Sequence, residues 1–150
     1  REAILQAGLL DESFFMYGEE ADLCLRARGF SARPLVTPAA TIIHYGGASE
    51  TARADKMVRL LAAKATLINR HWSRAMAPLG RALLAAWPAS RAIATTALAA
   101  LTGSQSRKAS AAAWREIWAR RNAWRQGYEA CAPDARKLPA LVQSSARGRS

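Results

Sequence analysis

Three carboxylates lie within four residues of this chain, at Glu19, Glu20 and Asp22. They follow directly after the aromatic and apolar run of residues 14–17 and the glycine Gly18. A carboxylate held beside packed aromatic side chains can act as the general base of an enzyme. The cluster therefore suggests the floor of an active site. The same acids also suit the first turn of a helix, where negative side chains stabilise the positive end of the helix dipole.

A second residue able to do chemistry, His44, follows Glu20 by 24 residues. It ends a short apolar run and precedes two glycines, Gly46 and Gly47, where the backbone can approach a ligand closely. An imidazole in this position can bind a metal. It can equally be a structural residue at the end of a strand, and the sequence leaves both interpretations open.

Both helices and strands are expected around these residues. We expect helices at residues 1–6 and 19–28, the second ended by Gly29, and short strands at 33–37 and 41–44, separated by Pro38. From residue 51 the pattern becomes helical. The expected elements there are an amphipathic helix at 52–72, helices at 75–86 and 89–101 with breaks or starts at Pro78 and Pro88, a loop at 103–109 and a helix at 110–127.

The sequence also predicts which basic side chains pair with acids and which face solvent. Arg26 and Arg28 are placed to pair with the acidic cluster in a structural role. The basic side chains of the amphipathic helix, Arg70 among them, are expected on its solvent-facing side. The sequence thus predicts a solvated basic face after residue 51.

Four motifs in order then resemble a known family. They are GLLDESFF at 8–15, YGEEADLCLR at 17–26, PAA at 38–40 and HYGGAS at 44–49. Together they resemble the second half of the catalytic domain of inverting family 2 glycosyltransferases, and in particular the rhamnosyltransferase-like members that build bacterial surface polysaccharides. The resemblance covers about residues 1–74. It implies an α/β fold, namely the C-terminal portion of a GT-A, Rossmann-like domain, followed by a mainly α-helical region.

The resemblance also implies roles for single residues. In that family the second acidic position of the YGEEAD segment carries the catalytic base, which assigns this role to Glu20. Glu19 and Asp22 belong to the same site, where they orient it or cap the helix. The histidine at the position of His44 binds the divalent metal, Mg or Mn, or the diphosphate. The donor would be a nucleotide-sugar and the acceptor a glycan or a lipid-linked molecule.

Relatives of this kind bind the nucleotide with a first half that ends in a DxD metal motif, and this chain contains no DxD. We therefore expect a C-terminal piece of a longer enzyme that is inactive alone. The expected organisation is a catalytic part at 1–50, a helical basic region at 51–131 and a disordered tail at 132–150.

The net charge of +11 is unevenly placed. Residues 1–50 carry four basic and seven acidic side chains, whereas residues 51–150 carry eighteen basic and four acidic ones. Such a basic region suits an anionic partner, such as a membrane surface or a lipid-linked diphosphate. One sector of the helix at 110–127 carries large apolar and basic side chains, which suit a core face, arginine stacking or an interfacial membrane helix: Trp114, Ile117, Trp118, Arg121, Trp124, Arg125 and Tyr128.

The main alternative function is accordingly a basic, Trp-rich peripheral membrane-binding module without catalysis. Nucleic acid is not an expected partner, because the basic residues are dispersed and form no known recognition motif. No apolar run reaches about 18 residues, so no membrane span is indicated. The two cysteines, Cys24 and Cys131, form no disulfide framework. We expect a cytoplasmic location, peripheral on the cytoplasmic face of the inner membrane.

Overall fold

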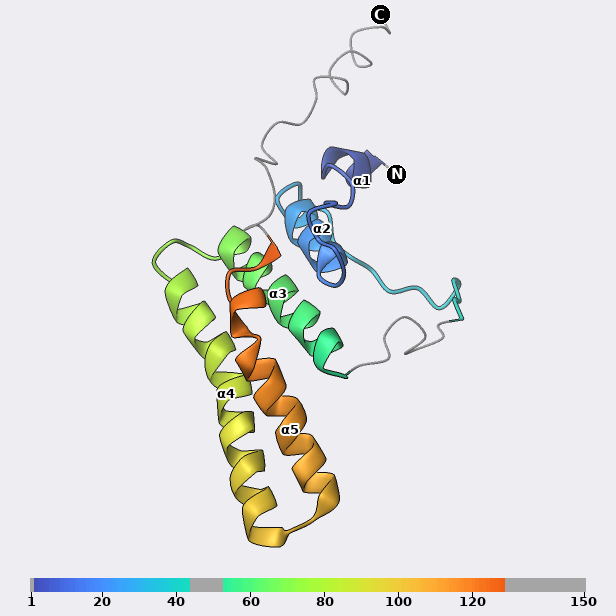
Figure 1. Cartoon of the computed structure of the whole chain (residues 1–150). Helices are drawn as coiled ribbons and strands as arrows, with labels where there is room; N and C mark the ends of the chain where they lie inside the picture. Colours follow the sequence, from blue (N-terminus) through green and yellow to red (C-terminus); the bar gives the residue numbers. More distant parts are fainter. Residues whose placement is uncertain (1, 44–52, 129–150) are drawn as a thin grey trace, which may run out of the picture.

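The computed structural model describes residues 2–43 and 53–128, and the regular structure in both ranges is helical. The helices are α1 (Glu2–Gln6), α2 (Glu19–Arg28), α3 (Arg53–His71), α4 (Ala77–Thr102), α5 (Gln105–Ala119) and a short 3-10 helix, η1 (Arg121–Ala123). Figure 1 shows α4 and α5 as a long antiparallel hairpin. Helix α3 lies between this hairpin and the small α1–α2 pair.

The predicted α/β fold is wrong for this part of the chain, since neither residues 2–43 nor 53–128 contain a strand. Residues 33–37 and 41–43, where strands were expected, are irregular. Their apolar side chains are almost fully exposed, as Val36 (101%) and Ile42 (86%) illustrate. A strand requires a neighbour that satisfies its backbone N–H and C=O groups. The described residues provide no such neighbour, so the GT-A, Rossmann-like expectation fails here.

The predicted helices at 1–6, 19–28 and 52–72 are confirmed as α1, α2 and α3, each within the described residues. The predicted break at Pro88 is wrong, because α4 continues through it. Proline inside a helix costs about 3 kcal/mol. Burial of Pro88 on the same helix face as Ala92 and Ala99 offsets this cost, and the neighbouring Trp87 ring packs edge-on against Trp114 of α5 at 5.3 Å.

The end of the hairpin also differs from the prediction. Only Gly103 and Ser104 connect α4 to α5, instead of a loop over 103–109, and α5 ends at Ala119 rather than at residue 127. Gly103 has a φ of 65°, and this left-handed conformation ends α4 within one residue. The tight connection brings the two helices into contact along most of their length (Figure 1).

The core lies where α3 crosses the hairpin. Small side chains on one face of α3 allow close approach, and two tryptophans from the C-terminal part fill the space between the helices. Trp124 is 1% exposed, and its indole N–H donates to the carbonyl of Ile117 at 3.1 Å. The expected interfacial stripe is thus mainly core. Its buried members are Trp114, Ile117 and Trp124, packed with Ala54, Val58, Leu61, Ala62 and Ala92.

After η1 the chain turns back across α3 at Gly127, whose φ is 80°. A Cβ at this position would lie 2.5 Å from the Thr66 hydroxyl oxygen, so only glycine fits. The Tyr128 N–H then donates to that hydroxyl at 2.7 Å. The Tyr128 hydroxyl lies 2.8 Å from the carbonyl oxygen of Met16 and 3.0 Å from that of Arg59. This turn therefore links the N-terminal segment to α3.

Candidate functional site

The acidic cluster lies on the first turn of α2, which begins after Gly18 in a left-handed conformation (φ 88°). Gly18 turns the chain sharply between Phe14, which is buried, and the helix. Within α2, Glu19 and Asp22 are three residues apart and share a face, whereas Glu20 points to a different side. The first turn thus separates the Glu20 carboxylate from those of Glu19 and Asp22.

Asp22 is the centre of an ion-pair network between α2 and the end of α3. Its side chain is only 1% exposed. One carboxylate oxygen, Oδ2, accepts a hydrogen bond from Arg26 Nε at 2.7 Å. The other, Oδ1, lies 2.8 Å from His71 Nε2 and 3.7 Å from Arg70 Nη1. Because both oxygens face cationic or imidazole partners, Asp22 is fixed in a structural role.

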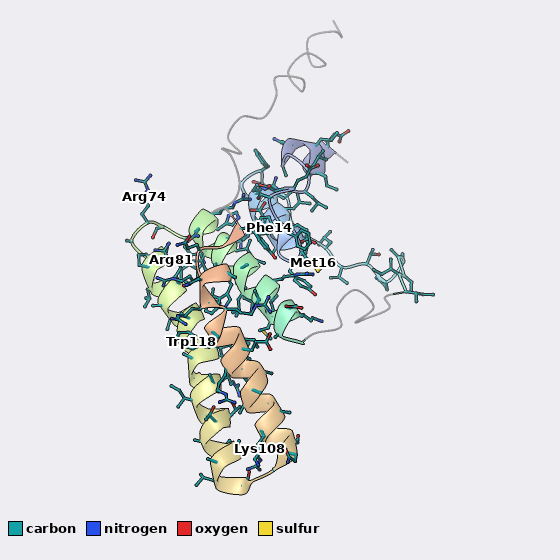
Figure 2. All side chains as sticks on the ribbon, viewed as in Figure 1. Phe14, Met16, Arg74, Arg81, Lys108 and Trp118 are labelled. Carbon is teal, nitrogen blue, oxygen red and sulfur yellow. The ribbon has the colours of Figure 1, made fainter. Side chains whose placement is uncertain are left out.

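Arg70 extends the network to the loop before α2. Its guanidinium donates to Asp11 Oδ2 at 2.6 Å and to the Ser13 hydroxyl at 2.7 Å. It also lies 5.0 Å from the centre of the Phe14 ring, a cation–π contact (Phe14 is labelled in Figure 2). Arg70 therefore holds the loop and α2 on the same end of α3.

Arg26, on the other side of Asp22, connects α2 to the segment that follows α1. Its guanidinium donates to the carbonyl oxygens of Ala7 and Leu9, the second at 2.7 Å. The predicted pairing of Arg26 with the acidic cluster is confirmed. For Arg28 no such pair exists among the residues that the structure describes. The acidic helix is thus anchored by Arg26 at α1 and by Arg70 and His71 at α3.

Asp11 has a perturbed ionisation within this network. Burial raises the pKa of its carboxyl, but hydrogen bonds from the backbone N–H and hydroxyl of Ser13, a hydrogen bond from Arg70 and the Arg70 charge together hold the pKa below its ordinary value. The backbone bond from Ser13 is 2.8 Å long. The ionised form of Asp11 is therefore favoured in the folded protein.

This lowered pKa predicts acid sensitivity of the fold. A carboxyl with a depressed folded-state pKa stabilises the protein above its unfolded pKa of about 3.9, and the contribution disappears as the pH falls through the folded value. We expect Asp11→Asn to lose about 1 kcal/mol or less at neutral pH, because the pair with Arg70 is partly exposed. When urea unfolding is measured between about pH 5 and pH 2, the free energy of unfolding should fall less steeply with falling pH for the variant than for the wild type. Identical slopes would show that Asp11 makes no contribution.

The three predicted catalytic acids have different surroundings. Glu20 is exposed and makes no hydrogen bond or ion pair with any other residue of the described ranges. Glu19 is half-buried, and its Oε2 atom is buried without a hydrogen-bond partner in the described part of the chain. Asp22 is fully engaged. Of the three, only Glu20 presents an accessible carboxylate.

The remaining site predictions lie outside the described residues. These are His44, the candidate metal ligand, and the tail at 132–150. Within residues 2–43 and 53–128, no three His, Cys, Asp or Glu side chains are close enough to hold a metal ion. The Mg or Mn site was expected at a DxD motif outside this chain and at His44, so it stays a prediction.

The sequence did not predict the roles of two network residues, Arg70 and His71. Arg70 was expected on a solvated basic face, and His71 was given no role. His71 is 49 residues from Asp22 in the chain, and no local pattern signals a contact of that length. The one available signal was its position beside Arg70, in the last turn of an amphipathic helix. Histidine and arginine there favour an anionic neighbour.

Comparison of the chain with protein-family models, with curated proteins and with solved structures finds no match in any of the three. None of the helices in the described ranges is both long and apolar enough to cross a membrane.

Proposed function

We propose that this chain supplies the acceptor-activating part of an inverting glycosyltransferase that uses a nucleotide-sugar donor, with Glu20 as general base. The observation that supports it is that the carboxylates of one helical turn differ in exposure and in pairing. Asp22 is buried among cations, and Glu20 is exposed and unpaired in the described structure. A general base must come within hydrogen-bond reach of the hydroxyl that it deprotonates. The exposed Glu20 carboxylate is accessible to such a hydroxyl, whereas the buried Asp22 carboxylate is held by its partners.

In the proposed reaction, the Glu20 carboxylate accepts the proton of an acceptor hydroxyl as the hydroxyl oxygen attacks the anomeric carbon of the donor. The bond between that carbon and the diphosphate oxygen breaks, and its electron pair leaves with the nucleoside diphosphate. Attack from the opposite side inverts the anomeric configuration. Such a base contributes roughly 10²–10⁴-fold to the rate.

The other two acids would support this step. Asp22 is a positioning residue, because it fixes α2 against α3 through His71 and Arg70. The buried Oε2 atom of Glu19 has an unmet acceptor position, which a hydroxyl of the substrate would satisfy. The acceptor would be a glycan or a lipid-linked molecule, in keeping with the surface-polysaccharide enzymes that the motifs resemble.

A donor-binding part is needed in addition, because the 150 residues contain no DxD motif. The exposed apolar side chains at positions 35, 36, 42 and 43 offer a surface on which such a part would pack. A divalent metal would be held by residues beyond those described, and His44 is the candidate from this chain. The activity would be cytoplasmic, at the cytoplasmic face of the inner membrane.

The proposal predicts how activity divides between this chain and the full-length gene product. We expect the 150-residue chain alone to bind no nucleotide-sugar specifically at millimolar concentration, because transfer requires donor and acceptor to be held together in line. The full-length gene product should release nucleoside diphosphate in an acceptor-dependent way. Calorimetric titration and a coupled release assay over a panel of nucleotide-sugars would measure the two.

Either measurement can contradict the proposal. Specific millimolar or tighter binding of a nucleotide-sugar by the 150-residue chain would place the donor site within it. A full-length gene product without acceptor-dependent release for any donor of the panel would rule out the proposed activity.

A further inference from the structure

A basic groove of about 480 Å³ lies between the first turns of α4 and the end of α5. Its charged walls are Arg81, Arg121 and Arg125, and its aromatic wall includes Trp118. An adjoining hollow of about 260 Å³ shares Arg81 and adds Arg74. Figure 2 shows Arg74 and Arg81 at the same end of the hairpin as Trp118, with Lys108 at the opposite end. Four guanidinium groups thus surround two neighbouring hollows.

Among the described residues, these arginines have no carboxylate partner. Residues 53–128 contain fourteen Lys and Arg side chains but only two acidic ones, Asp55 and Glu116. Both acids form ion pairs with Arg120, whose Nη1 atom is 2.5 Å from Asp55 Oδ1 and 3.5 Å from Glu116 Oε1. Arg81 donates to the neutral amide oxygen of Asn69 at 2.9 Å. In the described part of the chain, no carboxylate neutralises the groove.

An apolar face of α4 borders this groove. Side chains at three- and four-residue spacing form one exposed stripe, about 33 Å long at 1.5 Å per residue: Leu79, Leu83, Ala86, Ser90, Ile93, Ala97 and Leu101. The larger ones are strongly exposed, with Leu83 at 60%, Ile93 at 71% and Leu101 at 83%. Ala82 of the groove directly precedes Leu83 of the stripe and lies about 100° round the helix from it, so the groove opens at the flank of the stripe. The stripe and the groove at its flank are together called the α4 surface.

We propose that the α4 surface docks on an anionic membrane, with α4 in the plane of the interface. The apolar stripe would enter the boundary between headgroups and acyl chains, and the groove arginines would bind lipid phosphates. An exposed apolar stripe, flanked by arginines that no described carboxylate neutralises, is typical of an interfacial amphipathic helix. This docking does not depend on sugar transfer, because it uses a different face from Glu20.

Other occupants fit the α4 surface less well. Nucleic acid would match the arginines but would leave the apolar stripe in water. Residues 129–150 carry four basic and two acidic side chains, so this segment does not complement the groove. A second copy of α4 would bring like charges together. An anionic lipid surface complements both the charge and the stripe.

Vesicle co-sedimentation of the 150-residue chain tests the docking. We expect binding to phosphatidylcholine vesicles that contain phosphatidylglycerol, much weaker binding to pure phosphatidylcholine, and a decline with added salt. The double variant Arg121→Gln with Arg125→Gln should bind about thirty-fold more weakly. The matched control, Arg28→Gln with Arg33→Gln, removes the same charge from exposed positions on the N-terminal side and should bind like the wild type.

A second pair of variants tests the apolar stripe. Leu83→Gln with Ile93→Gln should weaken binding at every salt concentration, and the control Leu35→Gln with Val36→Gln should not. Far-UV circular dichroism checks that each variant keeps its helices. Equal binding to neutral and anionic vesicles, no binding to either, or equal losses in variants and controls would overturn the proposal. Light scattering that shows a dimer lost on Arg121→Gln with Arg125→Gln would assign the surface to a second copy instead.

Discussion

Replacing Glu20 with glutamine is expected to lower the kcat of sugar transfer by at least about 100-fold. Glutamine keeps the size and hydrogen bonding of glutamate but cannot accept the acceptor's proton. The affinity for the nucleotide-sugar should stay unchanged, because binding of the donor does not require the Glu20 carboxylate. Acceptor-dependent release of nucleoside diphosphate by the full-length gene product measures the first quantity, and calorimetry measures the second.

Glu19→Gln is the matched control, since it makes the same chemical change one residue earlier in the same helical turn. We expect a smaller loss, because the half-buried Glu19 orients the site without taking the proton. Glu20 is exposed and unpaired among the described residues, so Glu20→Gln should not alter the free energy of unfolding. A Glu20→Gln enzyme that kept more than about a tenth of wild-type kcat would remove this residue as the base.

Asp22→Ala is expected to lower the free energy of unfolding by about 3 kcal/mol. The substitution removes a buried carboxylate and leaves Arg26, Arg70 and His71 facing one another without it. Breaking a buried ion pair typically costs about 3–5 kcal/mol. The lower end applies here, because the partner side chains are themselves 17–27% exposed and water replaces part of the interaction. Urea unfolding of the 150-residue chain, followed by circular dichroism, measures the change.

Glu20→Ala gives the control for this loss, because it removes the same charge from the exposed side of the same helix. Its expected effect on the free energy of unfolding is within about 0.5 kcal/mol. If Asp22→Ala destabilised the chain no more than Glu20→Ala, the network around Asp22 would have no structural importance. The comparison also separates stability from catalysis, since Glu20 should affect only the latter.

Local signals were sufficient for α1, α2 and α3, but they misplaced the bounds of α4 and α5 and predicted strands that the described residues do not form. The extent of α2 followed from its acidic first turn and from Gly29 after its last residue, and α3 followed from its apolar periodicity. Strand formation at 33–37 and 41–43 depends on a partner for the backbone, which local sequence does not specify. Pro88 was misread for a related reason, because its burial against the hairpin outweighs its local cost.

The placement of Glu19, Glu20 and Asp22 on the first turn of a helix was predicted correctly. Their catalytic roles stay a prediction. The contact of Asp22 with His71, which is distant in the chain from all three acids, had no local signal. The spacing of Glu19 and Asp22 does place them on a common face, and this alone favours Glu20 as the outward acid.

The contact of Tyr128 with Met16 has a consequence for the order of events during synthesis. The two residues are 112 positions apart, and the Tyr128 hydroxyl lies 2.8 Å from the Met16 carbonyl oxygen. A ribosome that adds about 5–20 residues per second needs on the order of ten seconds to cover this interval. Helix α2 is therefore synthesised early, whereas the Tyr128 contact with the segment just before it forms late. A nascent chain that stalls before Tyr128 already carries Glu20, the Asp22 partners and the Arg59–Met16 contact, but it lacks the Tyr128 hydroxyl that joins the Met16 carbonyl to that of Arg59.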